Sequence, residues 1–314
     1  MRPDGRRRVD TKTYESFGLH QSMSDGDSAR LVNGRSNREI QGALSTPGDR
    51  QYHLNPEAFV IDGTPRGAVR SYREWAGANV YPGTTRDLWI YTPPGFDPAG
   101  PAPALMVFQD GAGYLNRDGP IRAAAVFDTL TAAGEMPPTV GVFVTPGALE
   151  GVPQQRSIEY DSVTDAYARF LLEDVLPFVE REIGCALTTD PAHRTICGIS
   201  SGGICAFTAA WYRPDAFGRV LSHCGSFTAI RGGHNYPYLI RSTPRKPIRV
   251  WMQSGAADAD IILGNWPQAN QAVAASLEYA GYDYKFVFGE GGHSLAHGGA
   301  VFADALRWLW RAEA

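Results

Sequence analysis

The 314-residue sequence contains no apolar run that approaches the ~18 residues of a membrane-spanning helix. It also lacks a basic excess, because 29 Lys and Arg are set against 33 Asp and Glu, which gives a net charge of −4. Proteins that bind the phosphate backbone of nucleic acids normally carry the opposite balance. We therefore expect neither a membrane nor a nucleic acid among the partners of this protein.

Cysteine is scarce, and its spacing excludes two further classes of protein. A disulfide-stapled secreted domain and a zinc ribbon both need more cysteines, or cysteines at closer and more regular spacing. The sequence thus predicts a cytoplasmic protein with reduced, mostly buried thiols and no metal site. The four cysteines, none of which belongs to a CxxC pair, are Cys185, Cys197, Cys205 and Cys224.

The first 50 residues differ in composition from the rest of the chain. They contain 16 charged residues, many Ser, Gly and Asn, and no repeating apolar period. Such a stretch buries too little apolar surface to offset the entropy lost on ordering. The basic triplet at 6–8 leads into no apolar region of the kind found in secretory signals. We therefore predict a disordered N-terminal arm over residues 1–50 and a single domain over residues 51–314.

Short apolar runs alternate with helical periods from about residue 68 onward. Residues 104–108 and 140–144 are continuous apolar runs that end in turn residues. Such runs are typical of strands that are buried on both faces of a sheet. The predicted strands cover residues 68–80, 84–92, 104–108, 140–144, 194–199, 219–224, 248–253 and 284–288.

Apolar residues at helical spacing fill the gaps between the later strands. The spacing predicts helices over 163–178, 201–212, 265–280 and 302–310, and Pro177 should bend or restart the first of them. Leading strands followed by βαβ units favour an α/β fold, with a mostly parallel central sheet and helices on both faces. Ligands of such sheets bind beyond the carboxyl ends of the strands.

A nucleophile-elbow motif, G-x-S-x-G, spans residues 198–202 between a predicted strand and a predicted helix. Of its two serines, Ser200 alone has glycine both two residues before and two residues after it, and we predict it as a catalytic nucleophile. The backbone N–H of Ser201 is then a candidate oxyanion donor. A second donor is expected in the loop after the 104–108 strand, where we choose Ala112.

A serine nucleophile needs a general base, and a histidine after the last strand fits this role. His293 follows that strand directly in a Gly-Gly-His segment, so it should lie at the same sheet edge as Ser200. His297, four residues later, is the alternative. The acid that orients the base should lie between the serine and the histidine in the chain. Asp258, in the loop that leaves the 248–253 strand, is our first choice, and Asp260 is the alternative.

Several motifs together resemble the enterochelin-esterase-like putative esterase family, which lies near feruloyl and carbohydrate esterases in the α/β-hydrolase superfamily. These motifs are Gly-Ile-Ser-Ser-Gly-Gly at 198–203, Phe-Gln-Asp-Gly at 108–111, Gly-Asn-Trp-Pro at 264–267 and Gly-Gly-His at 291–293. The resemblance covers about residues 55–312. It implies ester hydrolysis by Ser200, His293 and Asp258 through an acyl-enzyme, without a metal or organic cofactor.

The expected substrate is a small-molecule carboxylic ester or lactone, such as a siderophore-type trilactone or a feruloyl ester. Tyr114, Tyr160 and Trp266 are expected to flank the site, because aromatic rings suit aryl or sugar rings. Two other functions stay open at this point. One is acyl transfer from the same acyl-enzyme, and the other is a non-catalytic binding role for the fold. The sequence does not determine the oligomeric state.

Overall fold

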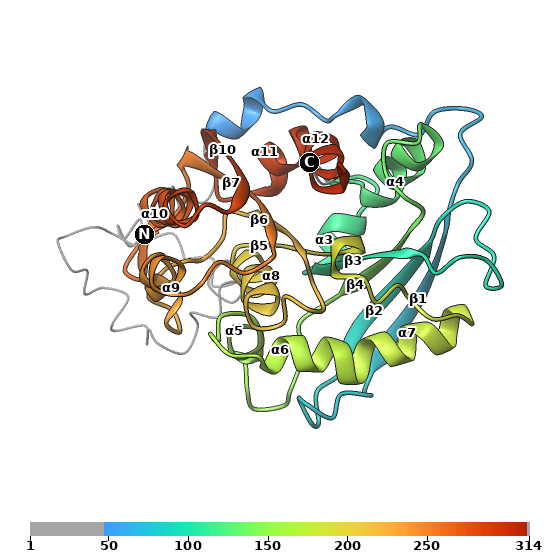
Figure 1. Ribbon diagram of the computed structural model, residues 1–314, viewed down its shortest axis with the longest axis horizontal. Coiled ribbons are helices and arrows are strands. Elements are labelled where there is room, and N and C mark those ends of the chain that lie inside the picture. The colour runs from blue at the N-terminus through green and yellow to red at the C-terminus, as the bar shows by residue number, and fades with distance from the viewer. Residues whose placement is uncertain (1–46, 313–314) are drawn as a thin grey trace, which may run out of the picture.

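An eight-stranded sheet runs through the centre of the protein (Figure 1), whose computed structural model describes residues 47–312. The first two strands and their junction to the sheet are antiparallel, and all later pairings are parallel. The strand order is β1 (Ala68–Trp75), β2 (Arg86–Thr92), β4 (Thr139–Val144), β3 (Ala104–Gln109), β5 (Arg194–Ile199), β6 (Arg219–His223), β7 (Arg249–Ala257) and β10 (Asp283–Gly292).

These strands confirm the predicted, mostly parallel sheet. The largest differences in length are at β1, which ends at Trp75 instead of residue 80, and at β10, which extends to Gly292 instead of residue 288. Glu74 has a positive φ of 51°, and the pairing with β2 shifts between Tyr72 and Trp75. A bulge of this kind ends regular pairing and turns the chain away from the sheet edge. A separate short ribbon, β8 (Asp260–Ile261) and β9 (Gly264–Asn265), follows β7.

Alternate residues of the buried strands face two separate hydrophobic clusters. In β3, Leu105 and Val107 point to one cluster, whereas Met106 and Phe108 point to the other. This alternation explains why the strand is apolar along its whole length. The first cluster lies under the helices from α5 to α10, and the second lies under α3, α4, α11 and α12 (Figure 1).

The helices cover both faces of the sheet, as predicted. Five of them, α3, α4, α5, α9 and α11, were not predicted from the sequence. Among the described residues, no helix is both long and apolar enough to cross a lipid bilayer. The helices are α3 (Gly111–Leu115), α4 (Ala123–Ala132), α5 (Gln155–Tyr160), α6 (Ala166–Arg169), α7 (Leu176–Ile183), α8 (Ser201–Tyr212), α9 (Tyr236–Ser242), α10 (Trp266–Tyr279), α11 (Leu295–Ala300) and α12 (Phe302–Trp310).

The helix changes type near Pro177, where we predicted that it would bend or restart. A π-helical turn, η5 (Phe170–Val175), joins α6 to α7, and Pro177 lies in the first turn of α7. Proline has no backbone N–H and its ring crowds the preceding turn, so a regular α-helix cannot continue through it unchanged. The wider π turn provides the adjustment.

The N-terminal boundary of the domain lies earlier than predicted. Residues 1–46 of the predicted arm lie outside the described residues. Residues 47–50, which we assigned to the arm, belong to the 3₁₀ helix η3 (Pro47–Gln51). The Asp49 carboxylate accepts hydrogen bonds from the Gly292 N–H and the Ser294 hydroxyl, both at 2.8 Å. These bonds fix the segment against the loop that carries His293, so the domain includes residues from at least Pro47.

Candidate active site

The three predicted catalytic side chains occupy equivalent places in the sheet. Ser200 directly follows β5, Asp258 directly follows β7, and His293 directly follows β10. These three strands are parallel members of one sheet. Their carboxyl ends therefore share one edge, where ligands of open α/β sheets bind.

Ser200 occupies a strained turn between β5 and α8. Its backbone angles are φ 60° and ψ −123°, a region that non-glycine residues rarely adopt. A side chain on Gly198 would collide with the backbone of Gly202, because the two glycines of the motif pack against each other. The turn therefore excludes a side chain at Gly198 and leaves little room for one at Gly202, as the elbow motif requires.

His293 is held by Asp258 through a short hydrogen bond. Its Nδ1 donates to Asp258 Oδ1 at 2.5 Å, and both side chains are almost fully buried. The Asp258 carboxylate also accepts from the Ser254 hydroxyl and from the Ala259 N–H, each at 2.7 Å. These bonds fix the orientation of the imidazole. Of the two aspartates considered, Asp258 makes this bond, whereas Asp260 lies in β8 and pairs with Asn265.

Contacts through two other side chains connect the serine to the histidine. The Ser226 hydroxyl lies 3.2 Å from the Ser200 Oγ, and the indole Nε1 of Trp266 donates to the Ser226 Oγ at 3.2 Å. The Trp266 ring meets the His293 ring edge-on, with 5.7 Å between their centroids. The Trp266 indole therefore contacts the candidate base directly and the candidate nucleophile through Ser226.

The other two histidines near the site have packing roles. His297, the alternative base, accepts a hydrogen bond from Gln253 and stacks on Tyr52 with 4.2 Å between ring centroids. Burial lowers the pKa of His297. Burial also lowers the pKa of His223 to about 3, with His297 adding to the effect. Both imidazoles are therefore neutral in the folded protein at neutral pH.

The prediction that three aromatic residues offer a substrate surface is wrong for this structure. Tyr114, Tyr160 and Trp266 have no exposed surface, so no ligand can touch them without a rearrangement. The Tyr114 hydroxyl hydrogen bonds with His223 at 2.9 Å, and the Tyr160 hydroxyl accepts from the Asp110 N–H at 3.3 Å. Each ring supplies large apolar area to the core while its polar atom finds a partner. The sequence alone could not distinguish this arrangement from an open one.

The predicted oxyanion donors lie on two segments that touch. Ser201 begins α8 and is buried, whereas Ala112 lies in the first turn of α3 and is exposed. A side chain on Gly202 would approach Asp110 Oδ2 to 3.1 Å, which shows how closely α8 meets the turn after β3. First-turn N–H groups have no partner within their own helix. The assignment of Ser201 and Ala112 as donors stays a prediction.

An arginine fork fixes the turn after β3. Arg156 of α5 donates from Nε to Asp110 Oδ1 at 3.0 Å and from Nη2 to Asp110 Oδ2 at 2.8 Å. Asp110 itself has left-handed backbone angles at the start of α3. Two parallel charge-assisted bonds hold a planar guanidinium and a carboxylate in one geometry. The fork therefore holds the proposed oxyanion loop in place, a role the sequence did not reveal.

Cys224, Asp258 and His293 could also be read as a metal-ligating group, because their ligand atoms lie within 4.8 Å of one another. Two observations favour hydrogen bonding instead. His293 Nδ1 already donates to Asp258. Burial raises the pKa of the Cys224 thiol well above its usual range, whereas metals bind the thiolate.

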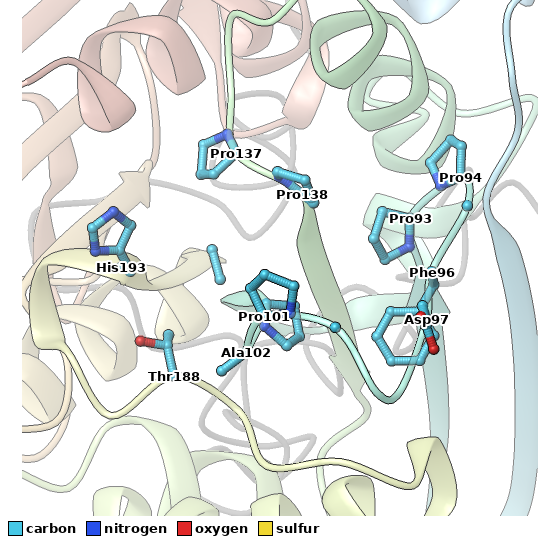
Figure 2. A pocket seen from close by; sticks show the side chains of 14 residues that line it. Pro93, Pro94, Phe96, Asp97, Pro101, Ala102, Pro137, Pro138, Thr188 and His193 are labelled. Atoms are coloured by element: carbon cyan, nitrogen blue, oxygen red, sulfur yellow. The ribbon is translucent and has the colours of Figure 1, made fainter.

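Among the cavities that are lined by described residues, two large ones lie at the opposite edge of the sheet and a smaller one lies near the His293 loop. Figure 2 shows the first, of about 570 Å³, in which proline rings and His193 surround the space. It lies at the amino ends of the strands, because Ala104 begins β3 and Pro138 precedes β4. The second, of about 600 Å³, is basic and lies at the start of β6, β7 and β10. The third, of about 270 Å³, lies between Tyr52 and Ala296 of α11, near the His293 loop.

Comparison with known proteins gives the family. A sequence model described as "Putative esterase" matches residues 78–309. The chain belongs to this esterase family. Within it, the chain is similar to the iron(III) enterobactin esterase of Dickeya dadantii, with 26% identity over 247 residues, and to that of Escherichia coli, with 28% identity over 231 residues. Both alignments cover 71% of the chain, which spans about half the length of these relatives, 51% in each case.

Solved structures of esterases share the fold of this family member. The enterobactin esterase of Shigella flexneri superimposes with a TM-score of 0.62 at 22% identity, over 85% of this chain and 64% of that protein. A ferulic acid esterase superimposes with a TM-score of 0.61 at 18% identity, over 78% of this chain and 98% of that protein. The fold is therefore that of the α/β-hydrolases, and the predicted enterochelin-esterase-like family is confirmed.

Proposed function

We propose that this protein is a serine ester hydrolase in which Ser200 is the nucleophile, His293 the general base and Asp258 the residue that orients it. The observation that carries the proposal is the buried hydrogen bond between His293 Nδ1 and Asp258, at the same sheet edge as the strained Ser200 turn. With Nδ1 donating to the carboxylate, the Nε2 atom of the imidazole keeps its lone pair. It can therefore accept a proton from serine.

The reaction would proceed through an acyl-enzyme. His293 Nε2 takes the proton of Ser200, and the freed Oγ electron pair forms a bond to the ester carbonyl carbon. The negative carbonyl oxygen of the tetrahedral intermediate accepts hydrogen bonds from the N–H groups of Ser201 and Ala112. His293 then gives its proton to the leaving alcohol, and water repeats the sequence to release the acid. Asp258 stays ionised and stabilises the imidazolium formed in each step.

The family supports a small-molecule carboxylic ester or lactone as substrate. Relatives are named as esterases of iron(III) enterobactin, and a structural neighbour is named as a ferulic acid esterase. We infer a siderophore-type trilactone, a feruloyl ester or a similar ester, hydrolysed in the cytoplasm without a cofactor.

An ester panel tests this function. Purified protein is incubated with p-nitrophenyl acyl esters, feruloyl esters and a catecholate trilactone, with the Ser200→Ala variant as the matched control. The proposal expects turnover of at least one ester by the wild type, and at least ~10³-fold less by the variant. Alcohol acceptors in parallel reactions separate hydrolysis from acyl transfer. Turnover that persists in the variant, or no turnover of any ester, would contradict the proposal.

A further inference from the structure

Ser226 is a second serine directly against the candidate nucleophile. It lies in the loop after β6, is almost fully buried, and its N–H donates to the Ser200 carbonyl at 3.0 Å. Its Oγ has two hydrogen-bond partners within the described part of the chain. One is the Ser200 Oγ and the other is Trp266 Nε1, each at 3.2 Å.

The chemistry of the indole sets the direction of the bond between Trp266 and Ser226. A tryptophan Nε1–H can only donate, so the Ser226 oxygen must accept from Trp266. The proton of the Ser226 hydroxyl is still to be donated, and we assign it to the Ser200 Oγ, which is the other hydrogen-bond partner of Ser226 among the described residues. When Ser200 accepts this bond, its own proton is left for a different acceptor.

We propose that Trp266 and Ser226 form a two-step donor relay that ends on the nucleophile and leaves the Ser200 proton for His293. This inference rests on the proposed function, since it assigns the relay to Ser200 acting as a nucleophile. The relay fixes the Ser200 side chain in one rotamer. As the Ser200 proton moves to His293 Nε2 and the Oγ electron pair attacks the carbonyl carbon, the Ser226 hydroxyl remains a donor to that oxygen.

The position of Trp266 supports this role, because its surroundings hold the indole from several sides. The Asn265 side chain caps α10 by accepting from the Gln268 N–H at 2.9 Å. The Asn270 side chain donates to the Trp266 carbonyl at 3.0 Å and to the Gly225 carbonyl at 2.9 Å. Asn270 thus ties Trp266 to the residue that precedes Ser226. The same indole packs edge-on against His293. It therefore contacts the proposed base and also directs its N–H toward Ser226.

The test uses Ser226→Ala, Trp266→Phe and their double variant, with Ser222→Ala as the control. Phe keeps a ring against His293 and removes the N–H. Ser222 is also a buried serine of the β6 region, but its hydroxyl has no hydrogen-bond partner among residues 47–312. For each variant, kcat and KM are measured on the best ester of the panel. The rate of Ser200 labelling by a fluorophosphonate is measured as well.

The relay predicts that Ser226→Ala lowers kcat and the labelling rate about tenfold, the effect of one lost hydrogen bond in the transition state, with KM unchanged. Trp266→Phe lowers both rates by a smaller factor. In the Ser226→Ala background, Trp266→Phe causes no further loss, because the relay is already broken. Ser222→Ala keeps the rates of the wild type.

Several results would overturn the relay while leaving the proposed function intact. They are an unchanged kcat in Ser226→Ala beside an inactive Ser200→Ala variant, losses that multiply in the double variant, and a higher KM at constant kcat. Full activity of Ser200→Ala would instead refute the function itself. Melting temperatures accompany each variant. If Ser226→Ala does not fold, Trp266→Phe alone decides, and a labelling rate equal to the wild type refutes the relay.

Discussion

Two histidine–aspartate pairs lie within residues 47–312, one at each edge of the sheet, and they differ in burial and in their surroundings. His293 and Asp258, at the carboxyl edge, are joined at 2.5 Å, and their side chains are 4% and 0% exposed. His193 and Asp190, at the amino edge, are joined at 2.8 Å, and their side chains are 50% and 52% exposed. In water the second pair is weak and mobile. Burial therefore distinguishes an oriented base from a surface contact.

The surroundings of the two pairs differ as well. Around His293, polar atoms connect Ser200, Ser226 and Trp266 into one buried cluster. Around His193, six of the 14 residues that line the cavity are prolines (Figure 2), and none of the 14 is a serine or cysteine. The one lining residue with a hydroxyl is Thr188, and its Oγ1 accepts a hydrogen bond from the Asp190 N–H. This difference supports the proposal that the chemistry belongs to the carboxyl edge, and the following experiments test that proposal.

The largest expected effect is the loss of the base. His293→Ala should lower kcat/KM by about 10³-fold or more, because serine, base and acid act as a unit. His193→Ala removes the same imidazole from the other pair and should leave kcat/KM unchanged. Steady-state ester hydrolysis by both variants checks the difference. A comparable loss in His193→Ala would show that the amino edge takes part in catalysis.

Substitution of the aspartates should likewise affect catalysis at the carboxyl edge and not at the amino edge. Asp258→Asn keeps the shape of the side chain but favours the wrong tautomer of His293, so kcat should fall by at least roughly 10²-fold. Asp260→Asn should lower kcat by a smaller factor, and Asp190→Asn should leave kcat unchanged. The rates of the three purified variants decide the matter. If Asp260→Asn is the most damaged enzyme, the acid has been misassigned by two residues.

A smaller effect is expected from the N-terminal segment that holds the His293 loop. Asp49→Ala removes the acceptor of the Gly292 N–H and of the Ser294 hydroxyl, the two neighbours of His293. Each lost bond is worth about 1 kcal/mol, so a severalfold decrease in kcat is expected. The control is Asp62→Ala, at an exposed position of the same N-terminal region. Equal rates for both variants would show that the segment does not position the loop.

The smallest effect is expected from His223→Gln, which should change the pH dependence of the unfolding free energy in acid. The folded-state pKa of His223, about 3, lies below the ordinary value of 6.5, so the unfolded chain binds an extra proton between these values. This contribution to stability is present above pH 6.5 and is lost as the pH falls toward 3. His223→Gln should lower the slope of unfolding free energy against pH by about 1.4 kcal/mol per pH unit between pH 6 and 4.

Denaturant titrations of the wild type and of His223→Gln at several pH values measure that slope. Burial raises the pKa of Asp161 to about 6, which acts in the opposite direction, but it does so equally in both proteins. The difference between the two slopes therefore isolates His223. Parallel slopes would mean that the buried imidazole does not stay neutral in acid.

The two central strands β3 and β4 could be predicted from the sequence because each is a nearly continuous apolar run with a turn at its end. Ser200, Asp258 and His293 could be placed at one sheet edge because each comes after a predicted parallel strand, at its carboxyl end. The short helices were missed because five to seven residues show too little of a 3.6-residue period. The ten-residue α4 was missed because its alanine-rich sequence has only a weak apolar stripe.

The aromatic residues could not be placed from the sequence, because burial depends on which elements pack above them. Trp266 belongs to a recognisable Asn-Trp-Pro motif, yet the motif does not reveal that its N–H points to Ser226. Ser226 itself carries no sequence signal, since its role arises from the approach of the β6 loop to the Ser200 turn. Contacts between loops of different strands are tertiary information.

Labelling with a fluorophosphonate, followed by peptide mapping, tests most directly whether the chemistry belongs to the carboxyl edge. The reagent forms a stable bond with a serine only when a base activates it. We expect one adduct per chain on Ser200 in the wild type and in His193→Ala. We expect none in Ser200→Ala and at least ~10³-fold slower labelling in His293→Ala. An adduct on another residue, or labelling of Ser200 that does not depend on His293, would contradict the account.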